Sequence, residues 1–120
     1  MSLPEDAVIK IQAERLRELL KWREYLPHLV DAAKKILGEE VEIYVIGSAV
    51  EGRLTVDSDI DIVIIAKEAS KPGLRRAQIL SETWKEMEKR GVPWWYPFEI
   101  HLMTREEFKI LEKGKVLRLH

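Results

Sequence analysis

Two short apolar segments, each with a polar signature at one end, constrain the fold of this chain more than any other feature. Residues 41–46 read Val-Glu-Ile-Tyr-Val-Ile and are followed directly by Gly47-Ser48. Residues 60–65 read Ile-Asp-Ile-Val-Ile-Ile and begin within Asp59-Ile60-Asp61. Both segments are rich in β-branched residues and are bounded by turn-forming or charged residues, which predicts two β-strands.

The two aspartates predict a metal site. Side chains alternate across a strand, so Asp59 and Asp61 are expected on the same face. Two neighbouring carboxylates repel each other, and a divalent cation is the usual compensation. Mg²⁺ takes one or two carboxylates and fills its remaining positions with water and phosphate oxygens. A tight Gly47-Ser48 turn would offer backbone N–H groups and a hydroxyl to the same phosphates, so we expect a site for metal and triphosphate together.

A third strand is predicted by the strict alternation of Phe-Glu-Ile-His-Leu-Met at 98–103. This alternation places Glu99 and His101 on one face. We expect Glu99 to supply a further carboxylate to the metal site, because such a site needs one more acid from an adjacent strand. His101 is more simply explained as part of a solvent-exposed polar face, and it is left out of the site.

Helical periodicity accounts for most of the remaining chain. Pro27 predicts that the first long helix breaks or kinks near Leu26, because proline disfavours helix at the residue before it. Thr104 and Glu107 have the spacing of a capping box, which predicts the start of a last helix. The tail at 115–120 is a candidate edge strand. The expected helices cover residues 5–25, 28–37, 48–51, 74–89 and, after the capping box, residues up to about 113.

Composition sets the outer limits of the interpretation. The 120 residues leave room for one modest core, so we expect a single domain over 1–120, with an N-terminal helical segment at 1–37 and a core at 41–120. A net charge of −1 does not favour direct binding of nucleic acid or of an anionic membrane. The absence of cysteine excludes disulfides and thiolate zinc sites. No apolar run approaches the roughly 20 residues that cross a bilayer, and no signal-peptide pattern is present, so we expect a cytoplasmic protein.

Two groups of residues outside the site have more than one interpretation. Lys71, Arg75 and Arg76 lie near the start of the helix expected at 74–89 and could contact a polyphosphate, although a solvated helix face is the simpler explanation. Trp94-Trp95 belong to an aromatic loop that favours a core edge or an oligomer contact. Stacking on a nucleotide base is the alternative role for this loop.

The signature around the two strands is similar to that of a known family. Gly47-Ser48, a spacer of ten residues and Asp59-x-Asp61 resemble the motif of the DNA polymerase beta-like nucleotidyltransferase superfamily. The small size and the alternation of helices and strands extend the likeness to a minimal nucleotidyltransferase (MNT), the antitoxin of HEPN/MNT toxin–antitoxin pairs. The resemblance implies an α/β (α+β) fold in which helices pack on a small mixed β-sheet similar to the palm of polymerase beta.

The resemblance also implies roles for individual residues. The implied catalytic and metal-binding residues are Asp59, Asp61 and Glu99. The implied nucleotide-binding residues are Gly47, Ser48 and Arg53. The three carboxylates would hold two Mg²⁺ ions, with ATP as the substrate. The family commonly has aspartate where this chain has Glu99.

The activity proposed for the family is transfer of AMP from ATP to a tyrosine of the partner HEPN ribonuclease, which silences the toxin. We therefore expect a metal-dependent protein adenylyltransferase whose partner is a HEPN-domain toxin, with a second copy of the chain as a further candidate partner. The alternative is a non-catalytic antitoxin that neutralises the HEPN ribonuclease by binding alone, through its apolar helical stripe and Trp94-Trp95. Transfer to a small molecule, as in aminoglycoside-modifying relatives, is disfavoured because no substrate-binding domain follows the core.

Overall fold

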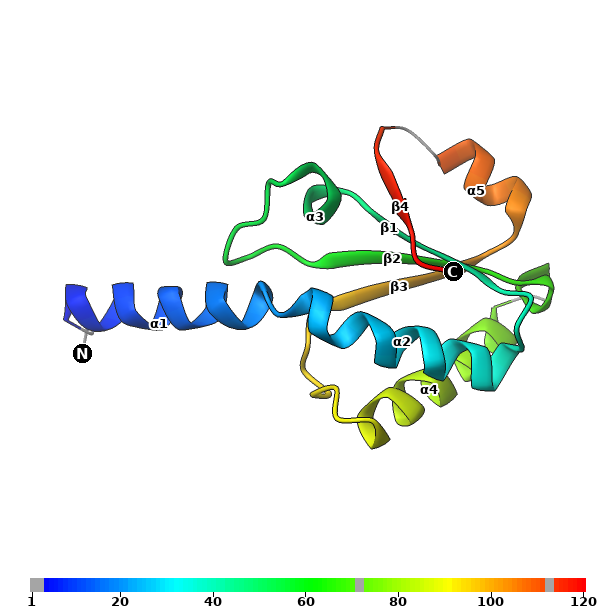
Figure 1. Ribbon diagram of the computed structural model, residues 1–120, viewed down its shortest axis with the longest axis horizontal. Helices are drawn as coiled ribbons and strands as arrows, with labels where there is room; N and C mark the ends of the chain where they lie inside the picture. The colour runs from blue at the N-terminus through cyan, green and yellow to red at the C-terminus, as the bar shows by residue number, and fades with distance from the viewer. Residues whose placement is uncertain (1–3, 71–72, 112–113) are drawn as a thin grey trace.

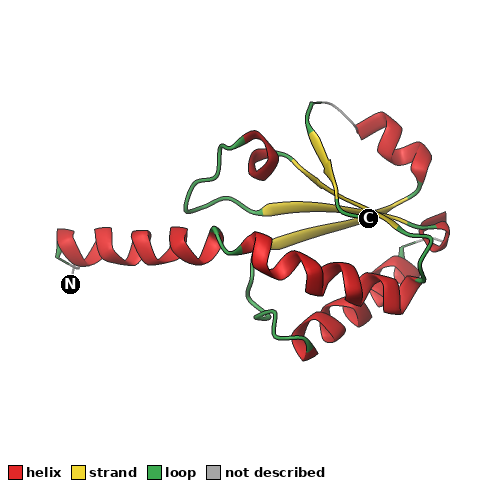
Figure 2. Cartoon of the chain, viewed as in Figure 1, coloured by secondary structure: helices red, strands yellow, loops and turns green. Residues whose placement is uncertain are grey.

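The fold is a four-stranded mixed sheet with helices on both sides, as the sequence predicts (Figures 1 and 2). The computed structural model describes residues 4–70, 73–111 and 114–120. The helices are α1 (Glu5–Leu19), α2 (Trp22–Leu37), α3 (Ser48–Glu51), the 3-10 helix η1 (Lys67–Ser70), α4 (Leu74–Lys89) and α5 (Arg105–Leu111). The strands are β1 (Glu42–Ile46), β2 (Ile60–Ile65), β3 (Phe98–Met103) and β4 (Val116–Arg118).

The order of the strands places the motif residues on adjacent strands of the sheet. The order is β3-β2-β1-β4, with β1 antiparallel to both β2 and β4, and β2 parallel to β3. In this register Asp61 is paired with Ile46 on one side and with Glu99 on the other. The tail forms the edge strand β4, which confirms that expectation.

One face of the sheet is covered by α2 and α4, which lie side by side beneath it in Figure 1. Ile60, Ile62 and Ile64 alternate along β2 toward this face and are almost fully buried. Burial of each such side chain contributes about 1.5–3 kcal/mol. The covered face therefore contains the main core.

The opposite face is covered only in part. Phe108 of α5 stacks on Tyr44 of β1, with ring centroids 4.8 Å apart. This contact shields Val63 and Ile65, which are buried in a second, smaller cluster. Asp61 lies at the other end of β2 and remains partly exposed. The end of the sheet next to Gly47 is therefore open to solvent.

The break in the N-terminal helices lies before the position that we expected. Instead of ending near Leu26, α1 ends at Leu19 and α2 begins at Trp22, so that Pro27 lies inside α2. Trp22 and Leu26 are both buried in the core, and this packing keeps the segment helical through the proline. The hydroxyl of Tyr96 reaches the carbonyl oxygens of Glu18 and Leu19 at 2.9 and 2.7 Å, which satisfies backbone groups freed by the break.

Within the described ranges, the helices are too short or too polar to span a bilayer. The capping box is present, because Thr104 Oγ1 accepts a hydrogen bond from the backbone N–H of Glu107 and the Glu107 carboxylate accepts one from the N–H of Thr104. The last residues of the helix expected after it, Glu112 and Lys113, lie outside the described residues.

Candidate active site

The turn between β1 and α3 lies directly against the carboxylate of Asp61. Gly47 has a φ of +76°, a conformation that L side chains rarely adopt. A Cβ atom added at Gly47 would lie 2.8 Å from Asp61 Oδ2. Glycine is therefore required at this position both for backbone conformation and for space.

Three side chains from β2 and β3 converge on the open face. One ligand atom each from Asp61, Glu99 and His101 lies within 4.8 Å of the other two. His101 Nε2 is 3.6 Å from Asp61 Oδ1 and 3.7 Å from Glu99 Oε1. The parallel pairing of β2 and β3 produces this convergence, because it places Asp61 beside Glu99, and His101 is two residues farther along the same face of β3.

Asp59 lies outside this group of three. It precedes the first residue of β2, is exposed, and lines a cavity of about 390 Å³ between α1 and the loops that lead into β2 and β3. Trp95 and Tyr96 from the aromatic loop and Ile11 from α1 also line the cavity. The role of Asp59 as a metal ligand stays a prediction.

The expected nucleotide-binding residues follow Ile46 at the end of β1. Ser48 is the first residue of α3, and its carbonyl oxygen accepts a hydrogen bond of 2.9 Å from the N–H of Arg53. The guanidinium group of Arg53 is exposed and forms an ion pair with Glu51. Arg53 would have to release Glu51 before it could bind a phosphate.

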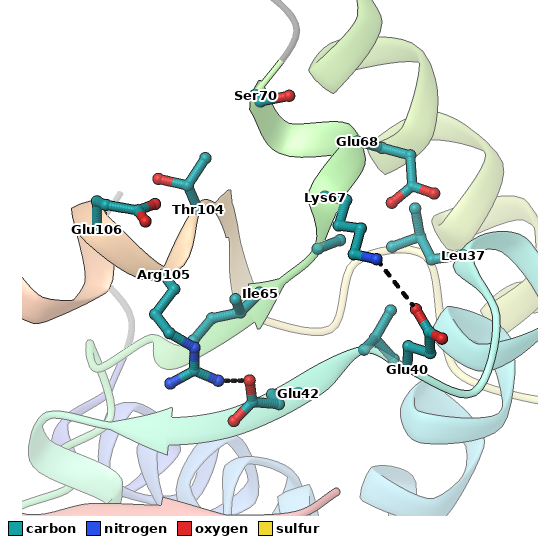
Figure 3. A pocket seen from close by; sticks show the side chains of 12 residues that line it. Leu37, Glu40, Glu42, Ile65, Lys67, Glu68, Ser70, Thr104, Arg105 and Glu106 are labelled. Carbon is teal, nitrogen blue, oxygen red and sulfur yellow. Dashed lines mark ion pairs between the residues drawn. The ribbon is translucent and has the colours of Figure 1, made fainter.

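A second cavity, of about 430 Å³, lies at the other end of the sheet (Figure 3). Two ion pairs lie among the residues that line it. Arg105 pairs with Glu42, and Lys67 pairs with Glu40 at 3.7 Å. Ile65 lines this cavity and is four residues from Asp61 along β2, a distance of about 13 Å. This cavity is therefore separate from the cluster of Asp61, Glu99 and His101.

Arg76, one of the three basic residues near the start of α4 for which we considered a polyphosphate contact, is bonded within the fold. Arg76 donates hydrogen bonds to both carboxylate oxygens of Glu107, at 3.1 and 2.6 Å, and to the carbonyl oxygen of Ala69 at 2.7 Å. The hydrogen bonds that Arg76 donates to Glu107, together with the one from the N–H of Thr104, lower the pKa of Glu107 to about 2. Arg76 thus joins α4 to α5, whereas Lys71 lies outside the described residues.

His101 is the residue of this cluster that sequence reasoning left out. Strand alternation placed it on the face of Glu99, but the same alternation is expected for any half-exposed strand. The missing information was the parallel pairing of β3 with β2, which places His101 within reach of Asp61. That pairing is a tertiary feature and has no local sequence signal.

The donor set fits a divalent cation. Two carboxylates and an imidazole are common metal ligands, and all three side chains keep between 31 and 54% of their surface exposed, so that a hydrated ion can reach them. The Gly47 backbone approaches Asp61 closely enough for a phosphate at the turn to share an ion with this carboxylate. Asp61 and Glu99 would hold the ion, and the turn would hold the phosphate.

Comparison with known proteins identifies the family of the domain. The family model described as a nucleotidyltransferase domain matches residues 26–117. A crystal structure of a "putative nucleotidyltransferase" is similar to this chain, with a TM-score of 0.57 and 28% sequence identity over 79% of this chain and 97% of that one. No curated protein matches the chain.

Proposed function

The chain belongs to the nucleotidyltransferase domain family, and from this premise we propose that its open sheet face transfers a nucleoside monophosphate from a nucleoside triphosphate to a hydroxyl group. The observation that carries the proposal is the contact between the Gly47 backbone and the Asp61 carboxylate. It supports a site in which the turn would bind a phosphate and the Asp61 carboxylate would bind a cation. Bringing the reacting groups together in this way is a large part of the catalysis of phosphoryl transfer.

In the proposed reaction, one phosphorus–oxygen bond forms and another breaks. The acceptor oxygen forms a bond to the α-phosphorus, the bond from that phosphorus to the bridging oxygen breaks, and pyrophosphate leaves. The proton of the hydroxyl passes to a carboxylate or to water. Bound divalent cations would neutralise the triphosphate and favour ionisation of the acceptor hydroxyl.

This chain's own residues would bind and orient the reactants. Gly47 and Ser48 would hold the phosphates, and Asp61 and Glu99, with Asp59 from the preceding loop, would hold Mg²⁺. Among Asp61, Glu99 and His101, Glu99 has the most exposed side chain, at 54%, and is the most accessible to an acceptor. It is therefore placed to accept the proton.

The donor in this proposal is ATP, and the acceptor is a hydroxyl of a HEPN-domain toxin that the transfer silences. The resemblance of Gly47-Ser48 and Asp59-x-Asp61 to the MNT motif supports this choice. The acceptor must be able to approach the sheet from the side of Glu99. That side is open at the Gly47 end, because α5 covers only the half of the face around Tyr44 and Val63.

The test is transfer of label from ATP labelled at the α-phosphate, with Mg²⁺, in the presence and absence of the HEPN protein. Label on the partner with the wild-type chain, and none with Asp61→Asn, supports the transferase. Asp31→Asn is the matched control, because it makes the same chemical change on α2, on the covered side of the sheet. A tight complex without any transfer would contradict the enzymatic proposal for that pair.

A second candidate function is neutralisation of the toxin by binding alone. It is favoured by exposed apolar side chains on α1 and the aromatic loop, of which Ile9 is 59% and Trp94 75% exposed. Such a surface commonly marks a protein–protein contact. Neutralisation that survives Asp61→Asn but is lost in Ile9→Asp would support this candidate. Light scattering of the isolated chain would show whether a second copy covers the same surface.

A further inference from the structure

The Nε2 atom of His101 forms no hydrogen bond with the two acids beside it. It lies 3.6 Å from Asp61 Oδ1 and 3.7 Å from Glu99 Oε1, and both separations are too long for a hydrogen bond. The side chain is 38% exposed and lies on the open face. Its ring nitrogen therefore points to the space between two acids without being bonded to either.

These separations are close to those within a coordination shell. Ligand atoms that lie 2.0–2.2 Å from a common ion are roughly 3–3.5 Å from each other. The two distances from His101 exceed this range by only a few tenths of an ångström, and the ligand atoms of all three residues lie within 4.8 Å of one another. Small side-chain rotations of exposed residues would bring the three ligand atoms around one ion.

We propose that His101 Nε2 is a nitrogen ligand of the same ion as Asp61 and Glu99, and that it makes this site prefer a first-row transition-metal ion such as Mn²⁺ to Mg²⁺. This inference rests on the proposed function, because it concerns the ion used there. Mg²⁺ binds oxygen ligands and retains water, whereas imidazole nitrogen suits transition metals. A mixed site of two carboxylates and one imidazole therefore shifts the preference from Mg²⁺ toward transition-metal ions, among which Mn²⁺ binds least tightly and is used here as the spectroscopic probe.

The first test is direct observation of the nitrogen. Tag-free protein loaded with Mn²⁺ is measured by electron spin-echo envelope modulation, which detects a coordinated imidazole by its ¹⁴N coupling. The coupling is expected in the wild type and in His28→Gln, whose histidine belongs to α2 on the covered side. It is expected to disappear in His101→Gln and His101→Ala, although the protein stays folded by circular dichroism.

The second test is metal affinity measured by titration calorimetry. Loss of an outer-shell partner of a metal ligand already lowers affinity by roughly 10- to 100-fold, so loss of the ligand itself should cost at least about tenfold for Mn²⁺. His101→Gln replaces the nitrogen by an amide oxygen, and its Mg²⁺ affinity should change by less than about twofold. The ratio of Mn²⁺ to Mg²⁺ affinity is therefore expected to fall about tenfold in this variant.

The outcomes separate this inference from the proposed function. Mn²⁺ bound with Asp61 dependence but without ¹⁴N coupling would overturn the role of His101 and leave the transferase intact. An unchanged affinity ratio in His101→Gln would have the same meaning. Failure of both Mn²⁺ and Mg²⁺ to bind at Asp61 would contradict the metal site of the proposed function itself.

Discussion

At Gly47, both the backbone conformation and the nearby carboxylate of Asp61 disfavour any residue with a side chain. In Gly47→Ala, the new Cβ would lie 2.8 Å from Asp61 Oδ2, so the carboxylate must move. With φ at +76° and ψ at −150°, the backbone is in a region essentially restricted to glycine, and a residue with a side chain adds about 1–3 kcal/mol of strain there. We expect lower thermal stability and a loss of nucleotidyl transfer of at least about tenfold.

Gly38→Ala is the control that separates backbone strain from displacement of the Asp61 carboxylate. Gly38 has a φ of +93°, so alanine there carries a comparable backbone penalty, but its Cβ would meet nothing within 4 Å. Calorimetry should find both variants destabilised, and the labelled-ATP assay should find transfer lost only in Gly47→Ala. Equal loss of transfer in both variants would mean that general destabilisation, and not the position of Asp61, explains the effect.

At the scale of elements, the junction between α1 and α2 depends on a residue from a distant loop. Tyr96 bonds the carbonyl oxygens of Glu18 and Leu19 through its buried hydroxyl, and burial raises its pKa far above the ordinary value. Tyr96→Phe leaves buried backbone oxygens without this donor, and we expect a loss of about 1–3 kcal/mol in the free energy of unfolding. Urea denaturation of Tyr96→Phe and Tyr25→Phe provides the comparison, because Tyr25 contacts the Tyr96 ring edge-on without sharing these bonds.

The link between α4 and α5 gives the chain a pH dependence of known sign. Hydrogen bonds from Arg76, together with the one from the N–H of Thr104, lower the pKa of Glu107 from 4.5 to about 2 in the folded state. The stabilisation is therefore fully present above about pH 4.5 and is lost as the pH falls toward 2. We expect Glu107→Gln to melt below the wild type at pH 7, with a difference that shrinks between pH 4.5 and 2. Glu106→Gln serves as the control, and a difference independent of pH would contradict the ion-pair explanation.

Sequence patterns predicted the elements that bear the motif better than they predicted the element junctions. The strands at 60–65 and 98–103 and the helix at 74–89 have the bounds that local periodicity indicates. The helix break was misplaced because Pro27 is a strong local signal, whereas the burial of Trp22 that overrides it is tertiary. The motif on β1 and β2 is local and was readable, but the pairing that adds His101 joins segments far apart in the chain.

For the whole molecule, one face of the sheet holds the main core, whereas the other face carries the candidate site beside a smaller buried cluster. The face under α2 and α4 is apolar, and Ile62 and Leu29 are fully buried there. The open face carries Asp61 and Glu99 side by side on adjacent strands, although like charges at such positions repel each other. Binding of a cation at the proposed site would offset this repulsion.

This repulsion predicts that removing one acid stabilises the metal-free protein. In EDTA at pH 8, above the ordinary titration range of histidine, Asp61→Asn should melt above the wild type by the equivalent of about 0.2–1 kcal/mol. Addition of 10 mM Mg²⁺ or Mn²⁺ should reverse the order, because an ion that binds only the folded wild type raises its stability with concentration. Asp31→Asn should keep the wild-type response to metal. If the wild type melts above Asp61→Asn in EDTA, Asp61 stabilises the fold without a metal. The repulsion between Asp61 and Glu99 would then not be a net cost to the metal-free protein.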